Sequence, residues 1–295
     1  MYQFKEIRCA ACDGDKAKVL GIRIPLSFPG CETRVVRCVG CGLMYANPMP
    51  FPDEDQIQKN FGDIGSYFPS SEEERLEFYD GILRGIERYS QVKGKLLDVG
   101  CGRGELVYMA QRGGWNAVGV DVSEGFVRHA KEKFHIDARA GELEKMRFAA
   151  ESFDAVSLVS VLQCSHHPRL LLQEINRILK KGGVLFIETT NYDGLLYILG
   201  DIFYRLMGQR KTTRLSPVSP AYEVYGFSSR SLREILLRTG FEVLDIQMTG
   251  DVGGGRGFRV VDMRTRVLHF LRYGVLLLGI ALGMGQVLNA WARKT

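Results

Sequence analysis

The sequence predicts an α/β domain with a mostly parallel sheet, preceded by a small zinc-ribbon domain. Three observations lead to this prediction. A mainly apolar run, Leu96–Val99, leads into glycines at alternate positions, which is typical of a buried parallel strand followed by a tight turn. The next apolar segment ends in Asp121, about 20 residues beyond that strand. Two Cys-x-x-Cys pairs precede these elements near the start of the chain.

The turn after the first strand contains Gly100, Gly102 and Gly104. Glycine tolerates positive φ and lets a ligand approach the backbone closely, so the pattern is typical of a nucleotide-like cofactor site. A turn that needs positive φ for structural reasons alone is the alternative. Residues 105–113 have the pattern of a helix, and residues 116–120 that of a second strand with Asp121 at its tip. A carboxylate there holds the ribose diol in dinucleotide-type folds, although it can also cap a helix.

The spacing of the glycines indicates which cofactor the turn would hold. NAD-binding turns follow G-x-G-x-x-G, whereas this chain has G-x-G-x-G preceded by Asp98. The resulting D-x-G-x-G-x-G pattern resembles the first motif of class I S-adenosylmethionine-dependent methyltransferases. Three later segments resemble further motifs of that family in the same order, so that the resemblance covers most of residues 95–250. They are Gly141–Leu162, His167–Asn191 and Phe227–Ile246.

The resemblance implies a Rossmann-like fold with a seven-stranded, mostly parallel sheet and helices on both faces. It also implies an S-adenosylmethionine site. Asp98 would lie near the methionine ammonium, Asp121 would accept hydrogen bonds from the ribose hydroxyls, and Glu142 would reach the adenine amino group. The other residues implied to line this site are Gly100, Cys101, Gly102, Gly104, Val122, Leu143 and Ser160.

Composition divides the chain into three parts. Residues 1–47 contain both cysteine pairs and form the predicted ribbon. Residues 48–94 begin with prolines at alternate positions, typical of a stiff extended linker, and continue with an S-x-x-E capping box and an amphipathic helix. Residues 95–295 form the domain that resembles a methyltransferase, with inserts at about 192–222 and 251–284.

The cysteine spacing predicts a structural zinc site. Each Cys-x-x-Cys pair places two thiolates on one side of a tight turn, and two pairs supply a tetrahedral four-thiolate site. Redox-active dithiols and unrelated free cysteines are the alternatives. Zinc with four thiolate ligands has no open coordination position, so we expect no catalysis from it. The ligands would be Cys9, Cys12, Cys38 and Cys41.

If the methyl acceptor is a hydroxyl or an amine, a base must take its proton. His166 and His167 are candidates because histidine titrates near neutrality, with a solvated helix-cap role before a proline as the alternative. Glu223, flanked by tyrosines, is a further candidate. Sequences that resemble the ubiquinone-pathway O-methyltransferases carry Glu-His and a later His at the equivalent places. This chain has Gln163-Cys164 and Glu223, so the resemblance does not extend to a catalytic metal.

Two strongly apolar segments lie in the inserts. Residues 195–203 precede the basic residues Arg205, Arg210, Lys211 and Arg214, which predicts either a substrate-capping helix or a surface that contacts a membrane or a lipid-linked acceptor. The second segment, at 273–284, is about 12 residues long and too short for the roughly 20 that span a bilayer. It is predicted to belong to a helix over 264–283, ahead of a closing strand.

Composition constrains location and partners. With 45% hydrophobic and 25% charged residues the chain resembles an ordinary soluble globular protein, and its net charge of +5 does not by itself indicate nucleic acid. The N-terminus is polar and unlike a signal peptide. Seven cysteines without such a signal predict a reducing, cytoplasmic location.

These features together predict transfer of a methyl group from S-adenosylmethionine to a small-molecule acceptor. By analogy the acceptor would be a glycan, a nucleotide sugar or a secondary metabolite. The first alternative is an RNA methyltransferase that binds nucleic acid with its ribbon, which the lack of a dense basic and aromatic stripe disfavours. The second is a cofactor-binding scaffold without catalysis. The sequence leaves the oligomeric state open.

Overall fold

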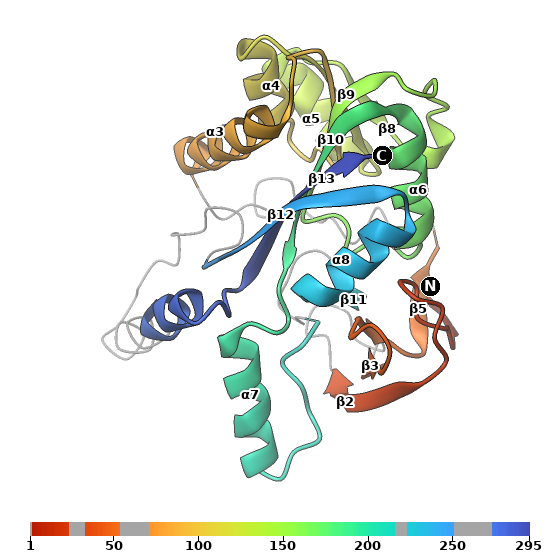
Figure 1. Ribbon diagram of the computed structural model, residues 1–295, viewed down its shortest axis with the longest axis vertical. Helices are drawn as coiled ribbons and strands as arrows, with labels where there is room; N and C mark the ends of the chain where they lie inside the picture. The colour runs from red at the N-terminus through yellow and green to blue at the C-terminus, as the bar shows by residue number, and fades with distance from the viewer. Residues whose placement is uncertain (1, 24–32, 54–70, 216–222, 251–272) are drawn as a thin grey trace.

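The computed structural model describes residues 2–23, 33–53, 71–215, 223–250 and 273–295 (Figure 1). A seven-stranded sheet forms its centre. The spatial order of the strands is β12 (Phe241–Thr249), β13 (Val287–Lys294), β10 (Leu179–Thr190), β9 (Phe153–Val159), β6 (Lys95–Val99), β7 (Asn116–Asp121) and β8 (Ala138–Ala140).

The sheet is parallel except at β13, which runs antiparallel to both of its neighbours, β10 and β12. The predicted closing strand is therefore present. The central strands are nearly continuous runs of apolar residues because helices cover both of their faces. The Rossmann-like, mostly parallel seven-stranded sheet predicted from the sequence is confirmed.

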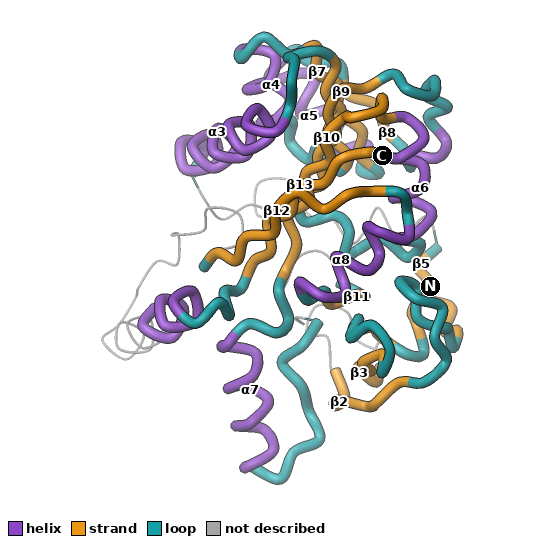
Figure 2. Tube along the Cα trace, viewed as in Figure 1, coloured by secondary structure: helices purple, strands orange, loops and turns teal. Residues whose placement is uncertain are grey.

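Helices lie on both faces of this sheet (Figure 2). One face is covered by α3 (Glu72–Tyr89), α4 (Glu105–Arg112) and α5 (Glu124–Phe134), which share one apolar cluster with the sheet. A second cluster contains α6 (Pro168–Ile178) and α8 (Ser229–Arg238) on the other face. A short 3-10 turn, η1 (Leu143–Lys145), follows β8.

The predicted capping box before α3 is present. The Ser71 hydroxyl accepts a hydrogen bond from the Glu74 amide, and the Glu74 carboxylate accepts one from the Ser71 amide. These two bonds satisfy amides that have no partner within the helix, which fixes where α3 begins.

The N-terminal part forms two small sheets. The larger has the order β11 (Tyr225–Gly226), β4 (Met44–Ala46), β3 (Thr33–Cys38) and β2 (Ala17–Arg23). Its first strand comes from the methyltransferase-like part of the chain and pairs with β4 through Tyr225 and Tyr45. The ribbon therefore completes its sheet with a strand that lies 180 residues further along the chain, as the pairing of Tyr45 with Tyr225 shows.

The segment that the sequence indicated as a stiff linker is part of the second small sheet. Residues of β5 (Met49–Pro52) pair antiparallel with β1 (Tyr2–Lys5). Successive N–H groups of a strand point to opposite sides, so prolines at alternate positions remove donors on one side only. Alternate prolines therefore fit an edge strand, in which that side faces away from the partner strand. The segment is extended, as expected, but it is anchored to the N-terminus instead of connecting two parts freely.

The first insert contains α7 (Leu195–Leu206), which extends from the end of β10 away from the central sheet (Figure 1). Asp193, between β10 and α7, forms ion pairs with Arg37 of the ribbon and Arg214 beyond α7. In the second insert residues 273–281 are helical, whereas residues 264–272 of the predicted helix lie outside the described residues. Within the described part of the chain, every helix is too short or too polar to cross a bilayer.

Candidate functional site

A cavity of about 390 Å³ opens where β6, β7 and β9 end. Ligands in open α/β sheets bind outside the carboxyl ends of the strands, and this volume is within the usual range of ligand pockets. Nine of the ten residues that the resemblance implied for the cofactor line this cavity, and Gly104 is the exception. The nine are Asp98, Gly100, Cys101, Gly102, Asp121, Val122, Glu142, Leu143 and Ser160.

The glycine turn forms the floor of the cavity. Gly100 and Gly102 have φ values of 74° and 51°, in the left-handed region that favours glycine. A Cβ on Gly100 would lie 2.2 Å from Cγ2 of Val161, which also lines the cavity. A side chain at this position would therefore collide with Val161, and glycine allows the two segments to pack closely beside the cavity.

Gly104 has a different environment. It precedes α4 with φ of 89°, and a Cβ there would lie 2.8 Å from the Cβ of Ala130 on α5 and 2.6 Å from Ile136 Cδ1. This glycine allows close packing behind the turn. Its predicted contact with the cofactor stays a prediction.

Asp121 is held at the tip of β7 by two backbone amides. Its Oδ2 accepts a hydrogen bond from the Gly102 amide and its Oδ1 one from the Ser123 amide, both at 2.8 Å. The helix cap of α5 is Ser123, whose hydroxyl accepts from the Phe126 amide, so Asp121 is not the cap that the sequence left as an alternative. Burial raises the pKa of Asp121 while these amides oppose the shift.

Asp98 is buried at the end of β6, where its Oδ1 accepts a hydrogen bond of 2.7 Å from the Ser157 hydroxyl. Burial, together with the nearby carboxylates of Asp121 and Glu105, raises the pKa of Asp98 to about 7. A cationic group in the cavity would favour the ionised form of this carboxyl. The position suits an ammonium ligand.

The sequence analysis missed Arg75, which lines the same cavity from α3. Its Nε lies 3.0 Å from Oε1 of Glu105, and both side chains are buried. The helical spacing of the sequence indicates that Arg75 lies on the apolar face of α3. It is followed at intervals of four, three and four residues by Tyr79, Ile82 and Ile86. A charged residue in register with a buried face indicates a specific partner.

The residues predicted for the adenine end lie beside η1. Leu143 is buried and Glu142 is exposed, with the Glu142 carboxylate 3.1 Å from the Lys145 ammonium. Both Glu142 and Leu143 line the cavity, together with Val122. An apolar wall next to a carboxylate acceptor suits a purine ring with an exocyclic amino group.

His166 and His167 line the cavity at the start of α6. His166 Nε2 lies 2.7 Å from the Pro50 carbonyl oxygen, and the Phe51 ring stacks 5.1 Å from the His166 ring. Because a carbonyl only accepts, Nε2 carries the proton in this contact, and Nδ1 of the neutral ring is then the nitrogen that can accept a proton. Burial lowers the pKa of His166. His167 is the N-terminal cap residue of α6, but its side chain makes no capping hydrogen bond.

Glu223 lies apart from the other predicted residues. It is buried and accepts hydrogen bonds from the Tyr192 hydroxyl and, at 3.1 Å, from the Thr190 hydroxyl. Burial raises its pKa. Glu223 is absent from the described residues that line the cavity, so the structure does not bring it together with the histidines. Its catalytic role stays a prediction.

The four paired cysteines converge in the ribbon. The ligand atoms of Cys9, Cys12, Cys38 and Cys41 all lie within 4.8 Å of one another, and two Sγ–Sγ separations are 3.4 Å. A zinc ion with Zn–S bonds of about 2.3 Å needs sulfur atoms roughly 3.8 Å apart at the corners of a tetrahedron. The cluster fits such an ion. Of the other cysteines, Cys31 lies outside the described residues.

Known proteins resemble the central domain of this chain. Residues 97–187 match the family described as "Methyltransferase domain". The chain is 27% identical over 179 residues to a ubiquinone biosynthesis O-methyltransferase of Coxiella burnetii. The aligned part covers 56% of this chain and 74% of the relative. It is 37% identical over 118 residues to the mitochondrial ubiquinone biosynthesis O-methyltransferase of Rattus norvegicus, covering 37% of this chain and 34% of that one.

Solved structures share the fold. A SAM-dependent methyltransferase from Archaeoglobus fulgidus aligns with a TM-score of 0.50 and 21% identity over 74% of this chain and 94% of its own. The PH0226 protein from Pyrococcus horikoshii OT3 aligns with a TM-score of 0.52 and 18% identity over 83% of this chain and 100% of its own. The matched residues run from β6 into β10 and contain the ends of β6, β7 and β9, at which the cavity opens.

These strands and their cavity therefore form a class I methyltransferase domain. The chain therefore carries an S-adenosylmethionine-dependent methyltransferase domain.

Proposed function

We propose that this enzyme methylates a hydroxyl group of a small-molecule acceptor, with His166 as the general base. The observation that carries the proposal is the position of His166 in the same cavity as the glycine turn, with its Nε2 within hydrogen-bond distance of the Pro50 carbonyl oxygen. The relatives named above are O-methyltransferases, which supports oxygen as the acceptor atom. A glycan, a nucleotide sugar or a secondary metabolite is the proposed acceptor class, and the cytoplasm is the proposed location.

The cofactor site is proposed to recognise each end of S-adenosylmethionine separately. The Asp98 carboxylate would bind the ammonium and the Arg75 guanidinium the carboxylate of the methionine portion, since both residues line the cavity. The Asp121 carboxylate would accept hydrogen bonds from the ribose hydroxyls. Glu142 and Leu143 would contact the adenine.

The bound cofactor supplies an activated methyl group, so the protein has to align the acceptor and exclude water. His166 would take the proton of the acceptor hydroxyl at Nδ1 as the new bond to carbon forms. The Pro50 carbonyl holds Nε2–H and thereby keeps the ring in the tautomer that can accept at Nδ1. Ser160 and Val161 would line the face from which the methyl group leaves.

We also propose that the four cysteines hold a structural zinc ion. The observation in support is the mutual distance of the four ligand atoms. The backbone packs closely against the cluster at Gly14, where an added Cβ would lie 3.3 Å from Cys12 Sγ. Zinc in this site would order the ribbon and take no part in methyl transfer.

The reaction is tested by incubating the purified enzyme with methyl-labelled cofactor and separate pools of glycans, nucleotide sugars, phenolic metabolites and bulk RNA. We expect the label in a small molecule, and mass spectrometry with fragmentation should place the methyl group on oxygen. Label on nitrogen or in RNA would overturn the proposed acceptor. Cofactor binding without label in any pool would favour the non-catalytic scaffold.

The pH dependence of cofactor binding tests the role of Asp98. The affinity for S-adenosylhomocysteine should weaken about tenfold from about pH 8 to about pH 6, because a carboxyl with a pKa of about 7 is mostly neutral at the lower pH and then cannot pair with the ammonium. Isothermal titration calorimetry measures this affinity. Asp98→Asn should bind more weakly and show a flat profile, and a flat profile for the unaltered enzyme would contradict the assignment.

A comparison of two ligands tests Arg75. Arg75→Met should weaken binding of S-adenosylhomocysteine about tenfold or more, because a charge-assisted hydrogen bond is lost. Adenosine, which lacks the amino-acid portion, should bind the variant as well as it binds the parent enzyme. Glu105→Gln, which removes the ion-pair partner but keeps the guanidinium, is the matched control. Equal weakening of both ligands by Arg75→Met would indicate general damage to the cavity.

A further inference from the structure

One face of α7 exposes a row of large apolar side chains. Leu199, Ile202, Phe203 and Leu206 are spaced as i, i+3, i+4 and i+7, so they lie along a single side of the helix. Phe203 is 60% and Leu206 82% exposed, and Met207 at the end of the helix is 60% exposed. Single exposed apolar residues are common, but a contiguous row of this kind marks an interaction surface.

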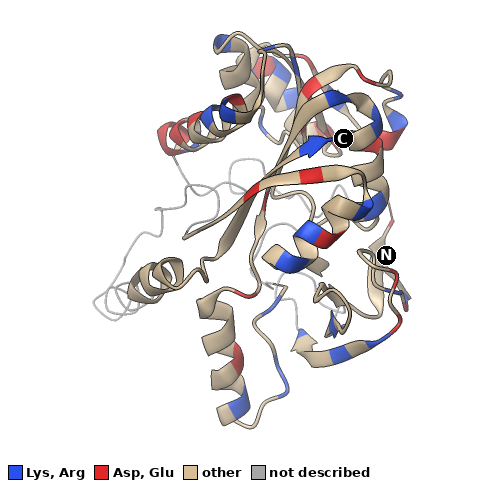
Figure 3. Cartoon of the chain, viewed as in Figure 1, with Lys and Arg blue, Asp and Glu red and all other residues tan. Residues whose placement is uncertain are grey.

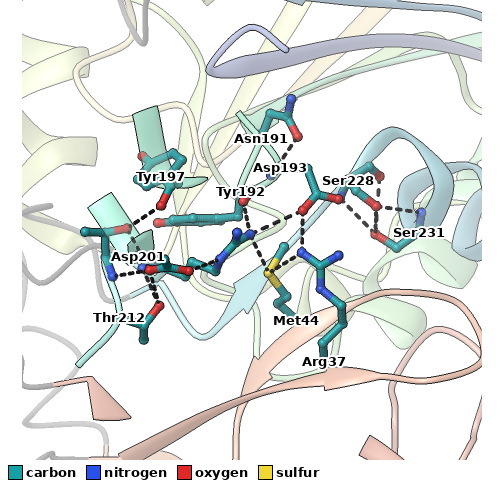
Figure 4. Close-up of polar contacts among 12 residues, drawn as sticks. Arg37, Met44, Asn191, Tyr192, Asp193, Tyr197, Asp201, Thr212, Ser228 and Ser231 are labelled. Atoms are coloured by element: carbon teal, nitrogen blue, oxygen red, sulfur yellow. Dashed lines mark hydrogen bonds and ion pairs between the residues drawn. The ribbon is translucent and has the colours of Figure 1, made fainter. Parts of the chain in front are cut away.

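A network of polar contacts joins α7 to the segment that follows it (Figure 4). Arg214 Nε lies 2.7 Å from Asp201 Oδ2, and the Thr212 hydroxyl donates a hydrogen bond of 2.8 Å to Asp201 Oδ1. The returning segment is also tied to the ribbon, because the Ile22 amide of β2 donates to the Arg210 carbonyl. These contacts leave the apolar row uncovered, because they are made by other residues of α7 and of the segment that follows it.

A second exposed apolar face lies next to the start of α7. The helix at residues 273–281 and the residue after it include Tyr273, Leu277 and Leu282, each at least half exposed. The Leu195 amide donates a hydrogen bond of 3.0 Å to the Met284 carbonyl, which brings the end of this helix next to the start of α7. Ten of the seventeen large apolar side chains that are exposed in the described part of the chain lie on these two segments, so the exposure is concentrated there.

The exposed charges on α7 and on the described residues that follow it, 207–215, have one sign. Arg205, Arg210 and Lys211 are exposed at the far end of α7 and in the segment that follows, where Figure 3 shows blue residues. The acidic residue of α7, Asp201, is buried and paired with Arg214, so it does not offset them at the surface. An apolar row beside exposed basic residues is complementary to a membrane interface with anionic lipid headgroups.

We infer that α7 and the helix at residues 273–281 form a docking surface for an anionic lipid bilayer. The apolar side chains of Phe203, Leu206 and Met207 would enter the boundary between headgroups and acyl chains. Arg205, Arg210 and Lys211 would lie at the level of the lipid phosphates, where each adds electrostatic attraction. The helices lie on the membrane and do not cross it.

Flotation of the purified full-length enzyme with vesicles tests this surface. Vesicles made of equal parts phosphatidylcholine and phosphatidylglycerol should carry the enzyme to the top of the gradient, and raised salt should reduce the bound fraction. The double variant Phe203→Glu, Leu206→Glu should bind at least tenfold less. Leu237→Glu on α8, which alters a leucine that is 56% exposed outside the two segments, should bind as the parent does.

Circular dichroism and S-adenosylhomocysteine binding should be unchanged in both variants, which separates loss of docking from loss of fold. No flotation of the parent enzyme, or equal flotation of the parent and the double variant, would overturn the inference. A concentration-dependent dimer without vesicles that the double variant abolishes would assign the surface to a second copy of the chain instead. These readouts do not depend on the methyl acceptor.

Discussion

Replacing His166 by Gln should lower kcat about a hundredfold or more and leave the affinity for S-adenosylhomocysteine unchanged. Glutamine keeps a polar group near the Pro50 carbonyl but cannot accept a proton at neutral pH. The cofactor contacts proposed above come from other elements, namely β6, the glycine turn, β7, α3 and the residues beside η1. Steady-state kinetics with the identified acceptor and calorimetry with S-adenosylhomocysteine measure the two quantities.

His167→Gln is the matched control, because His167 lines the cavity beside His166 but is more exposed. We expect a smaller loss for this variant. The pH profile gives a second criterion. Burial lowers the pKa of His166 below its ordinary value of 6.5, so activity should persist to more acidic pH than for a free histidine and should fall only when the ring becomes protonated. An unaltered kcat in His166→Gln would remove this residue from the mechanism.

Loss of one cysteine of the cluster should unfold the ribbon and lower the melting temperature of the whole chain by about 10 °C or more. A structural zinc ion contributes many kcal/mol to the folding of small domains, and each kcal/mol moves the melting temperature of a domain of this size by about 2–4 °C. The ribbon shares its apolar cluster with the central domain. Unfolding of the ribbon should therefore also destabilise the central domain.

Cys41→Ser is the informative variant and Cys31→Ser its control, since the spacing leaves Cys31 outside both pairs. Native mass spectrometry should find one zinc ion in the parent and in Cys31→Ser, and none in Cys41→Ser. Turnover of Cys41→Ser should also fall, because β5 holds the His166 ring and Arg37 holds Asp193. A metal-free Cys41→Ser that melts with the parent would show that the cluster does not stabilise the fold.

The cofactor half of the site could be predicted because its signals are local. Strand β6, the glycine turn and Asp121 follow one another within a short stretch, and each glycine is required by a backbone conformation. The capping box of α3 and the closing strand β13 could be predicted for the same reason, since each depends on residues that are neighbours in the sequence.

Contacts between distant segments could not be predicted in this way. Strand β11 has only two residues and no periodicity, so nothing in the sequence ties it to β4. The His166 contact with Pro50 spans 116 residues, and the ion pair between Arg75 and Glu105 spans 30. The residues next to Glu223 in the sequence do not indicate that the hydroxyls of Tyr192 and Thr190 donate hydrogen bonds to its carboxylate.

The β4–β11 pairing also constrains how the chain folds during synthesis. The ribbon sheet stays incomplete until Tyr225 and Gly226 have left the ribosome, so its first strands must wait for most of the chain to be made. During that time the free edge of β4 is a site for pairing with other chains. Early metal uptake by the cysteines, all encoded before residue 42, would give the nascent ribbon a stable core through this delay.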